Sequence, residues 1–163
     1  MNDMKGVAVI PLGKVPNVAL EALATHIHMH LRIPGEILPG LEDPLYALDE
    51  KRQQYNAAAI LKTLETMAFK DHLKVIGVLN VDLFIPIFTH VFGEAREGGH
   101  CALISLYRLR KELDESDSPV DQILERASKV ALHELAHLFN VPHCRDPECL
   151  MHFSMNLHDL DRT

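Results

Sequence analysis

The sequence has few basic residues and no long apolar run. Sixteen Lys and Arg residues against twenty-three Asp and Glu residues give the chain a net charge of −7. A basic surface that could neutralise a phosphate backbone is therefore missing, and nucleic acid is not expected as a partner. The apolar run near the N-terminus ends at Pro11 and Gly13, which makes it too short for a signal peptide or a membrane span. These absences predict a cytoplasmic protein that does not associate with membranes.

The scarcity of cysteine excludes a disulfide framework. Cys101, Cys144 and Cys149 cannot all pair within one chain, and two of them lie close to histidines, so metal or thiol roles suit them better. The sequence has neither an internal repeat nor a low-complexity segment. It does have 47% apolar and 24% charged residues over 163 positions, which is the composition of one compact domain with a single core.

The first predicted elements favour an α/β domain. The segment KGVAVIPLG at 5–13 is typical of a buried strand, and residues 15–33 follow with apolar side chains near helical spacing. The end of that second segment is ambiguous, because HIHMHL also alternates with period two and would place three histidines on one face of a strand. We favour the helix.

The middle of the chain is assigned from its apolar patterns and its turn residues. The expected elements are a connection over 33–44 with a short strand at 36–38, a helix over 49–70 and a central strand over 75–81. They continue with a loop over 82–86 and a hairpin of strands over 90–95 and 101–106 that turns at 98 and 99.

The clearest helix start lies at Ser118. This residue is suited to the N-cap, Pro119 to the first helical position and Asp121 to the first turn. Apolar residues then recur at helical spacing, so we predict a helix from Pro119 to about Phe139.

This helix carries the sequence HELAH. His133 and His137 are four residues apart, so their imidazoles project from one face of the helix and can share one zinc ion at about 2.0–2.1 Å. Glu134 can approach a water on that metal without occupying a ligand position. This pattern is the zinc-peptidase signature. The alternative is a pair of surface histidines that bind nothing.

The residues after the helix favour the metal. Asn140 stands where the helix must stop, and asparagine tolerates the left-handed conformation of such a turn. Pro142 prevents the helix from continuing, and His143 then returns as a third candidate ligand. Three protein ligands with a fourth position for water are typical of a catalytic zinc site, whereas structural sites are closed by four.

These residues resemble a known family. HELAHLFNVPHC is similar to the extended metzincin zinc motif, and HCRDPECLMHFSMNLHDLDR resembles its archaemetzincin variant. KRQQYNA, NVDLFIPIFTHVFGEAREGG and ISLYRLR are also similar to segments of that family, so the resemblance covers nearly the whole chain. It implies an α/β, metzincin-like fold in which a twisted mixed sheet packs on helices that include an active-site helix. Residues 1–163 would then form one metallopeptidase domain, with an N-terminal subdomain over 1–143 and a small C-terminal subdomain over 144–163.

Carried over by position, the resemblance makes His133, His137 and His143 the zinc ligands and Glu134 the general base. Met151 would be the methionine of the Met-turn, a hydrophobic floor beneath the zinc ion.

The sequence departs from the family pattern in two ways. Asn140 replaces the usual glycine, which should be tolerated if the turn needs only left-handed geometry. The family also has a later Cys-x-x-Cys that completes a four-cysteine structural zinc site, and this sequence ends without it. Cys144 and Cys149 would remain free thiols, form a disulfide, or bind metal with partners such as His152 or His158. We expect the second zinc to be lost, unless the chain is part of a longer one.

The remaining polar candidates are expected to have no role in catalysis or metal binding. For Asp82 and Glu94 a place near the cleft is one alternative, but we favour surface or capping roles for both. The other histidines, which have no acidic partner or matching motif, are expected to be solvated or in the core; they are His26, His28, His30, His72, His90 and His100.

The sequence therefore predicts a zinc-dependent peptidase acting on peptides or proteins. The zinc ion would lower the pKa of a water toward about 7 and Glu134 would take its proton. An exposed edge strand near 91–95 would bind an extended peptide by backbone pairing. The resemblance leans toward aminopeptidase-like or narrow peptide specificity, and the residues themselves do not separate endopeptidase from aminopeptidase activity. The alternative is a zinc-binding peptide-interaction module with little or no activity, and the ligands would also suit cobalt, nickel or iron.

Overall fold

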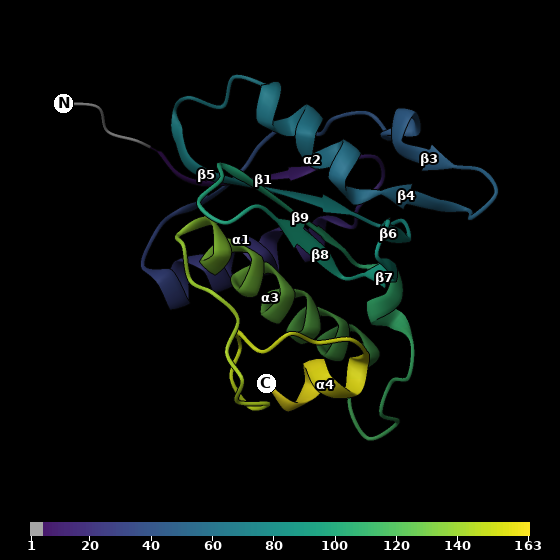
Figure 1. Cartoon of the computed structure of the whole chain (residues 1–163). Helices are drawn as coiled ribbons and strands as arrows, with labels where there is room; N and C mark the ends of the chain where they lie inside the picture. The colour runs from purple at the N-terminus through teal and green to yellow at the C-terminus, as the bar shows by residue number, and fades with distance from the viewer. Residues whose placement is uncertain (1–4) are drawn as a thin grey trace.

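The computed structural model describes residues 5–163, and a five-stranded sheet with helices on both faces lies at its centre (Figure 1). In spatial order the strands are β2 (Gly35–Ile37), β1 (Lys5–Pro11), β5 (His72–Leu79), β9 (Cys101–Ser105) and β8 (Gly93–Ala95). The first four run parallel, and β8 pairs antiparallel with β9 at the edge. The predicted α/β architecture is confirmed.

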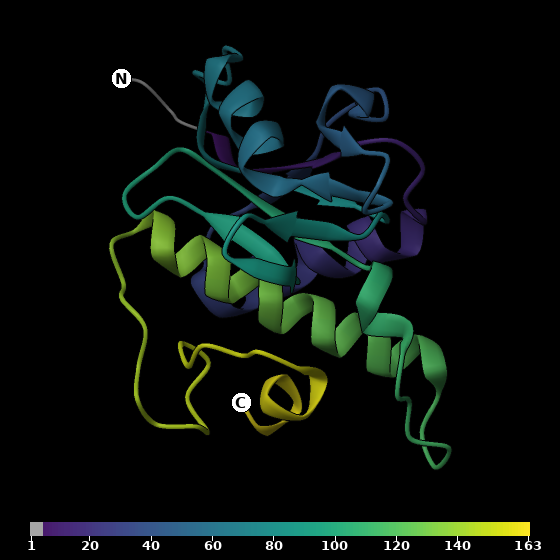
Figure 2. The ribbon, with the colours of Figure 1, turned by 45° about the vertical axis from the view of Figure 1, so that its right-hand side comes forward.

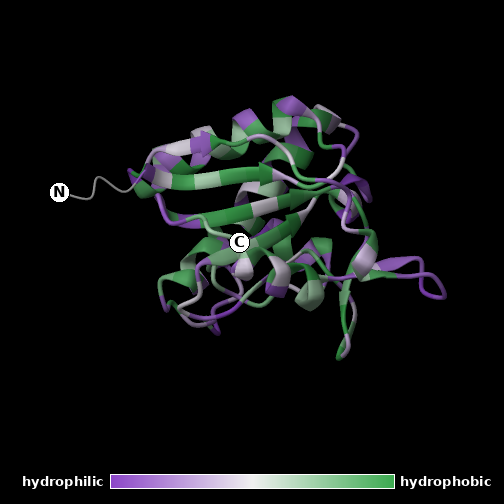
Figure 3. Ribbon diagram, turned by 90° about the horizontal axis from the view of Figure 1, so that it is seen from above, coloured by the Kyte–Doolittle hydropathy of each residue, from purple (hydrophilic) through white to green (hydrophobic). Residues whose placement is uncertain are grey.

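The central strands are covered on both faces. In β1, Val7 and Val9 belong to one hydrophobic cluster, whereas the alternating residues Ala8 and Ile10 belong to another. Strands buried on both faces require continuous apolar runs, and the strands of the sheet are accordingly coloured mostly hydrophobic in Figure 3. The first cluster lies beneath α1 (Asn17–Leu31) and α3 (Pro119–Leu138), and the second beneath α2 (Ala57–Thr66).

The ambiguous histidine segment is helical. Helix α1 continues through His26, His28 and His30 to Leu31 and ends at Arg32, which has a φ of 57° and donates its N–H to the His28 carbonyl. Four residues of α1 pack into the core on one side, and this burial outweighs the period-two pattern at its end.

The helix predicted over 49–70 is wrong for its first part. A hairpin of two short strands, β3 (Leu48–Asp49) and β4 (Gln54–Asn56), precedes the helix, which begins only at Ala57 and ends at Thr66 rather than at 70. The Asn56 side chain caps it by accepting the Ala59 N–H. The Gln54 amide donates to the Thr89 carbonyl, 35 positions away in sequence, so a contact invisible to local patterning selects the strand.

The loop predicted over 82–86 is also wrong. Residues Leu83–Ile85 form β6, which pairs with β4 and with β7 (Phe88–Val91) in a second sheet of order β3-β4-β6-β7. The single strand expected over 90–95 is divided at Phe92, so that β7 belongs to the second sheet and β8 to the first. The return strand β9 confirms the antiparallel pairing of the hairpin.

The C-terminal segment folds back under α3. It ends in α4 (Leu157–Arg162), which lies on the side of α3 away from the sheet (Figure 2). Two short 3-10 helices, η1 (Leu45–Ala47) and η2 (Tyr107–Arg110), complete the elements. Within residues 5–163, no helix combines the length and apolar character needed to cross a membrane.

Candidate metal centre

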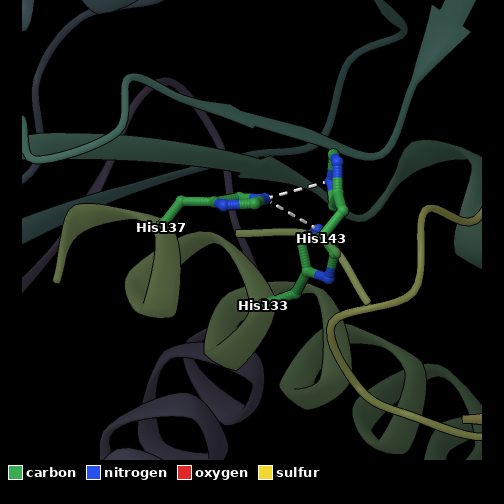
Figure 4. A group of neighbouring side chains, drawn as sticks. All are labelled: His133, His137 and His143. Carbon is green, nitrogen blue, oxygen red and sulfur yellow. Dashed lines mark hydrogen bonds between the residues drawn. The ribbon is translucent and has the colours of Figure 1, made fainter. Parts of the chain in front are cut away.

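Helix α3 and the turn after it bring three histidines together. The helix begins as predicted, with the Ser118 hydroxyl accepting the Asp121 N–H. The His137 Nε2 atom lies 3.1 Å from the Nε2 atoms of both His133 and His143 (Figure 4). Among residues 5–163 this is the only group of three or more His, Cys, Asp or Glu side chains whose ligand atoms lie within 4.8 Å of one another.

Backbone carbonyls fix the orientation of two of these rings. The Nδ1 atom of His133 lies 2.7 Å from the Leu150 carbonyl oxygen, and that of His137 lies 2.8 Å from the Val141 carbonyl oxygen. Because a carbonyl only accepts, both Nδ1 atoms must carry the proton, and in the neutral rings both Nε2 atoms present lone pairs. Lone pairs about 3 Å apart repel each other unless a cation lies between them.

The arrangement fits zinc. Two ligands of a tetrahedral zinc ion at about 2.0–2.1 Å are separated by about 3.3 Å, close to the 3.1 Å found here. Burial lowers the pKa of His133 to about 4, although the Leu150 hydrogen bond opposes the shift. Burial and the neighbouring His137 also lower the pKa of His143. These rings are therefore neutral and able to bind metal at neutral pH.

The turn after α3 has the left-handed geometry expected of it. Asn140 has a φ of 66°, its N–H donates to the His137 carbonyl, and the Val141 N–H donates to the Ala136 carbonyl. This bonding pattern is a Schellman motif with Asn140 at C′. The Gly98 N–H also donates to the His137 carbonyl, so the loop between β8 and β9 helps to close the same helix end.

We expect Asn140→Ala to lower the free energy of unfolding by about 1 kcal/mol, because alanine tolerates the left-handed conformation less well. Asn140→Gly is the matched control and should be as stable as the native protein, which urea denaturation of the three proteins would measure. Equal losses in both variants would instead assign the effect to the Asn140 side chain, which contacts Gly98.

Glu134 lies beneath the edge strand. It is buried, with 8% of its surface exposed. A Cβ atom on Gly93 of β8 would lie 2.9 Å from the Glu134 Cγ atom and 2.6 Å from the Leu103 carbonyl oxygen. Glycine at position 93 therefore lets the strand pass directly over Glu134. Burial, and to a smaller degree the nearby Glu94 carboxylate, raise the pKa of Glu134 well above its ordinary value.

A cavity of about 320 Å³ joins these residues. Its walls come from β7 and β8, from α3 and from the C-terminal segment, and they include aromatic side chains of Phe88, Phe92 and Phe153. Three glutamates line it, namely Glu94, Glu97 and Glu134, and none of its lining residues is Lys or Arg. The cavity thus combines aromatic walls with acidic side chains that no Lys or Arg in its lining balances.

The remaining candidate residues differ in whether they line this cavity. Asp82 accepts two hydrogen bonds from Arg108, at 2.6 and 2.9 Å, and stays outside the cavity. Glu94 was expected at the surface or as a cap, but it lines the cavity, and burial raises its pKa. His90 also lies in the cavity wall, where burial and the nearby Arg108 lower its pKa. Met151 is buried directly after Leu150.

The cysteines form no metal cluster within the described chain. Cys144, Cys149 and the buried Cys101 are free thiols. The backbone of Cys144 pairs with that of His152 in an isolated bridge, and the His152 ring donates to the Cys144 carbonyl. His152 lines the same cavity as the three histidines rather than completing a cysteine site.

Thiol labelling should separate Cys101 from the other two cysteines. Burial raises the pKa of Cys101 to about 12, so the reactive thiolate is nearly absent at about pH 8. With N-ethylmaleimide we expect two labels per native chain and three per denatured chain, counted by mass spectrometry. A native count of zero that returns to two after reduction would show instead that Cys144 and Cys149 form a disulfide.

The chain is similar to proteins of known class. The family model described as "Peptidase family M54" matches residues 18–163. An archaemetzincin of Pyrococcus furiosus is 38% identical, over 99% of this chain and 86% of that protein. The crystal structure of archaemetzincin from Archaeoglobus fulgidus, complexed with malonate, has a TM-score of 0.82 and 30% identity, covering 96% of this chain and 91% of that one. A zinc-dependent peptidase of Methanocorpusculum labreanum has a TM-score of 0.82 at 26% identity, with coverages of 96% and 92%.

Proposed function

This chain belongs to peptidase family M54, the archaemetzincins, and we propose that Glu134 is the general base with which it cleaves peptide bonds, beside a zinc ion held by His133, His137 and His143. It is a zinc-dependent metallopeptidase with a metzincin-like fold. The observation that carries the residue assignment is the convergence of three Nε2 atoms in the wall of the cavity that Glu134 also lines.

The side chains around the metal position have distinct tasks. When bound, zinc supplies Lewis-acid chemistry, which acidifies water and polarises the scissile carbonyl. Glu134, whose pKa is raised by burial, accepts the proton of the attacking water and delivers it to the leaving amine. The Leu150 and Val141 carbonyls hold His133 and His137 in the tautomer that offers Nε2.

We assign substrate binding to the free side of β8. This strand lies at the edge of the five-stranded sheet and runs antiparallel to β9. Gly93 and Glu94 of β8 line the cavity, so a peptide added to this edge would pass the metal position in extended form. The rings of Phe88 and Phe153 lie with their centroids 5.3 Å apart and their planes tilted by 34°, and they suit an apolar substrate side chain.

The charge of the cavity supports aminopeptidase-like specificity. With three glutamates and no Lys or Arg among its lining residues, the cavity has no Lys or Arg side chain to pair with a C-terminal carboxylate, whereas a free α-amino group would find acidic side chains that can accept its hydrogen bonds. Glu97 is exposed at the rim, and Glu94 is half-buried beside Glu134.

A peptide library with free and acetylated N-termini tests both proposals. Metal-stripped protein should not cleave, and added zinc should restore cleavage, which mass spectrometry would follow. We expect acetylation to lower the rate at least tenfold, corresponding to about 1.4 kcal/mol of lost interaction with the amino group. Equal cleavage of both libraries would contradict the aminopeptidase specificity alone. Failure of zinc-loaded protein to cleave either one would favour the peptide-interaction module.

Two further assignments remain proposals. We propose that the chain is a single domain in which residues 1–143 form the N-terminal subdomain and residues 144–163 the C-terminal one. The Asp161 carboxylate on α4 bonds to Arg126 of α3 and supports close docking of the second part. We also propose a cytoplasmic location, with which the three free thiols are consistent.

A further inference from the structure

A second cavity, of about 460 Å³, lies between α1 and α3. Helix α1 contributes His26 and His30 to its wall, and α3 contributes Asp121, Glu125 and Lys129. The metal-binding histidines of α3 line the first cavity instead. The second cavity therefore lies on another side of the same helix, and the two cavities share only Leu150 among their lining residues.

His26 and His30 have the same spacing on α1 that His133 and His137 have on α3. In the α3 pair the ring centroids are 4.7 Å apart, the planes cross at 85° and the Nε2 atoms are 3.1 Å apart. In the α1 pair the centroids are 5.7 Å apart and the planes are nearly parallel, at 7°. Within residues 5–163, the structure does not gather three ligand atoms within 4.8 Å at the α1 pair, so metal binding there requires the two side chains to rotate, which their i, i+4 spacing on the helix allows.

The polar groups of this cavity favour a cation. Asp121 and Glu125 also stand four residues apart and bring two carboxylates. Lys129 brings one positive charge, which lies 3.7 Å from the Glu125 carboxylate. The His26 Nδ1 atom is buried and has no hydrogen-bond partner among the described residues. A buried ring nitrogen without a partner is costly unless something binds it.

We propose that His26 and His30 bind a second divalent transition-metal ion in this cavity, with Asp121 or Glu125 as the carboxylate ligand. Zinc accepts mixed imidazole and carboxylate ligands, and copper(II) and nickel(II) share this preference. His30 is exposed, so a metal ion can reach the site from solvent. The bound ion joins α1 to α3, the helix that carries HELAH, and its binding is independent of peptide cleavage.

Zinc stoichiometry tests this site directly. The full chain is dialysed against buffered zinc, and bound zinc is counted by mass spectrometry of the elements. We expect about two zinc ions per native chain and about one in His26→Ala/His30→Ala. His28→Ala is the matched control, because His28 is exposed on α1 two residues from each ligand and does not line the cavity. This variant should keep two.

A second control separates this site from the cysteines. Cys144→Ser/Cys149→Ser should keep two zinc ions, whereas His137→Ala should keep only the ion bound by α1. Glu125→Gln together with Asp121→Asn should weaken binding of the second ion at least tenfold in a zinc titration. One zinc ion in the native chain, two in the His26→Ala/His30→Ala variant, or loss of an ion from the cysteine variant would each overturn the proposal.

Discussion

Glu134→Gln is expected to lower kcat/KM for peptide cleavage by about a thousandfold while leaving zinc bound. Glutamine has nearly the same shape and still fits beneath Gly93, where a Cβ atom would lie only 2.9 Å from the Glu134 Cγ atom. It cannot accept a proton from water or deliver one to the leaving amine. The loss should therefore appear mainly in kcat, measured with a peptide from the cleaved library.

The matched control is Glu115→Gln, an equivalent change in the exposed loop before α3. It should leave both zinc content and cleavage within about twofold of the native values. Zinc must be counted in the same samples. A zinc-loaded Glu134→Gln protein with native activity would remove Glu134 from the mechanism. Loss of zinc from this variant would contradict binding by the three histidines alone.

The metal centre was predictable because its geometry is local. The spacing of His133 and His137 fixes their relation once residues 119–138 are helical, and Ser118 and Pro119 signal that helix unambiguously. Asn140 then reverses the chain within one turn, which is why His143 returns to the same point. Every step depends on contacts within a few residues of sequence.

The walls of the cavity were not predictable in the same way. Phe88 and His90 lie on β7, in a sheet that pairs segments from 48 to 91. Because residues 82–86 were predicted as a loop, strand β6 and with it this second sheet were missed. Phe153 and Met155 belong to the C-terminal segment, where no periodic pattern indicates which side chain faces inward. Long-range docking decides these positions, so the specificity of the site was less visible than its chemistry.

The largest feature missed from sequence is Arg126, which stands in α3 without any motif around it. It is 3% exposed, and its guanidinium bonds to the Asp161 carboxylate and to the carbonyls of Leu109, Lys111 and Glu112 at 2.7–3.0 Å. These bonds use all five N–H donors of the side chain. One buried cation therefore fastens both the segment after η2 and the terminal helix α4 to the helix that carries the zinc ligands.

Arg126→Leu is expected to lower the free energy of unfolding by about 3 kcal/mol, because it leaves carbonyl groups of three residues without their charged partner. Asp161→Asn should lower the free energy of unfolding by only about 1 kcal/mol, since that carboxylate is partly exposed. Arg110→Leu, at the exposed end of η2, is the control and should lower it by about 0.5 kcal/mol or less. Urea denaturation would rank the three variants.

Arg126→Leu should also weaken peptide binding in the catalytic cavity while leaving zinc binding unchanged. Leu160 of α4 and Met155 before it line that cavity, so loosening α4 should raise KM for peptides several-fold while the zinc content stays at the native value. Loss of zinc together with stability would show that Arg126 supports the ligands themselves. Unchanged stability would mean that α4 docks through the apolar contacts of Leu157 and Leu160 with the core, and that the buried cation is dispensable.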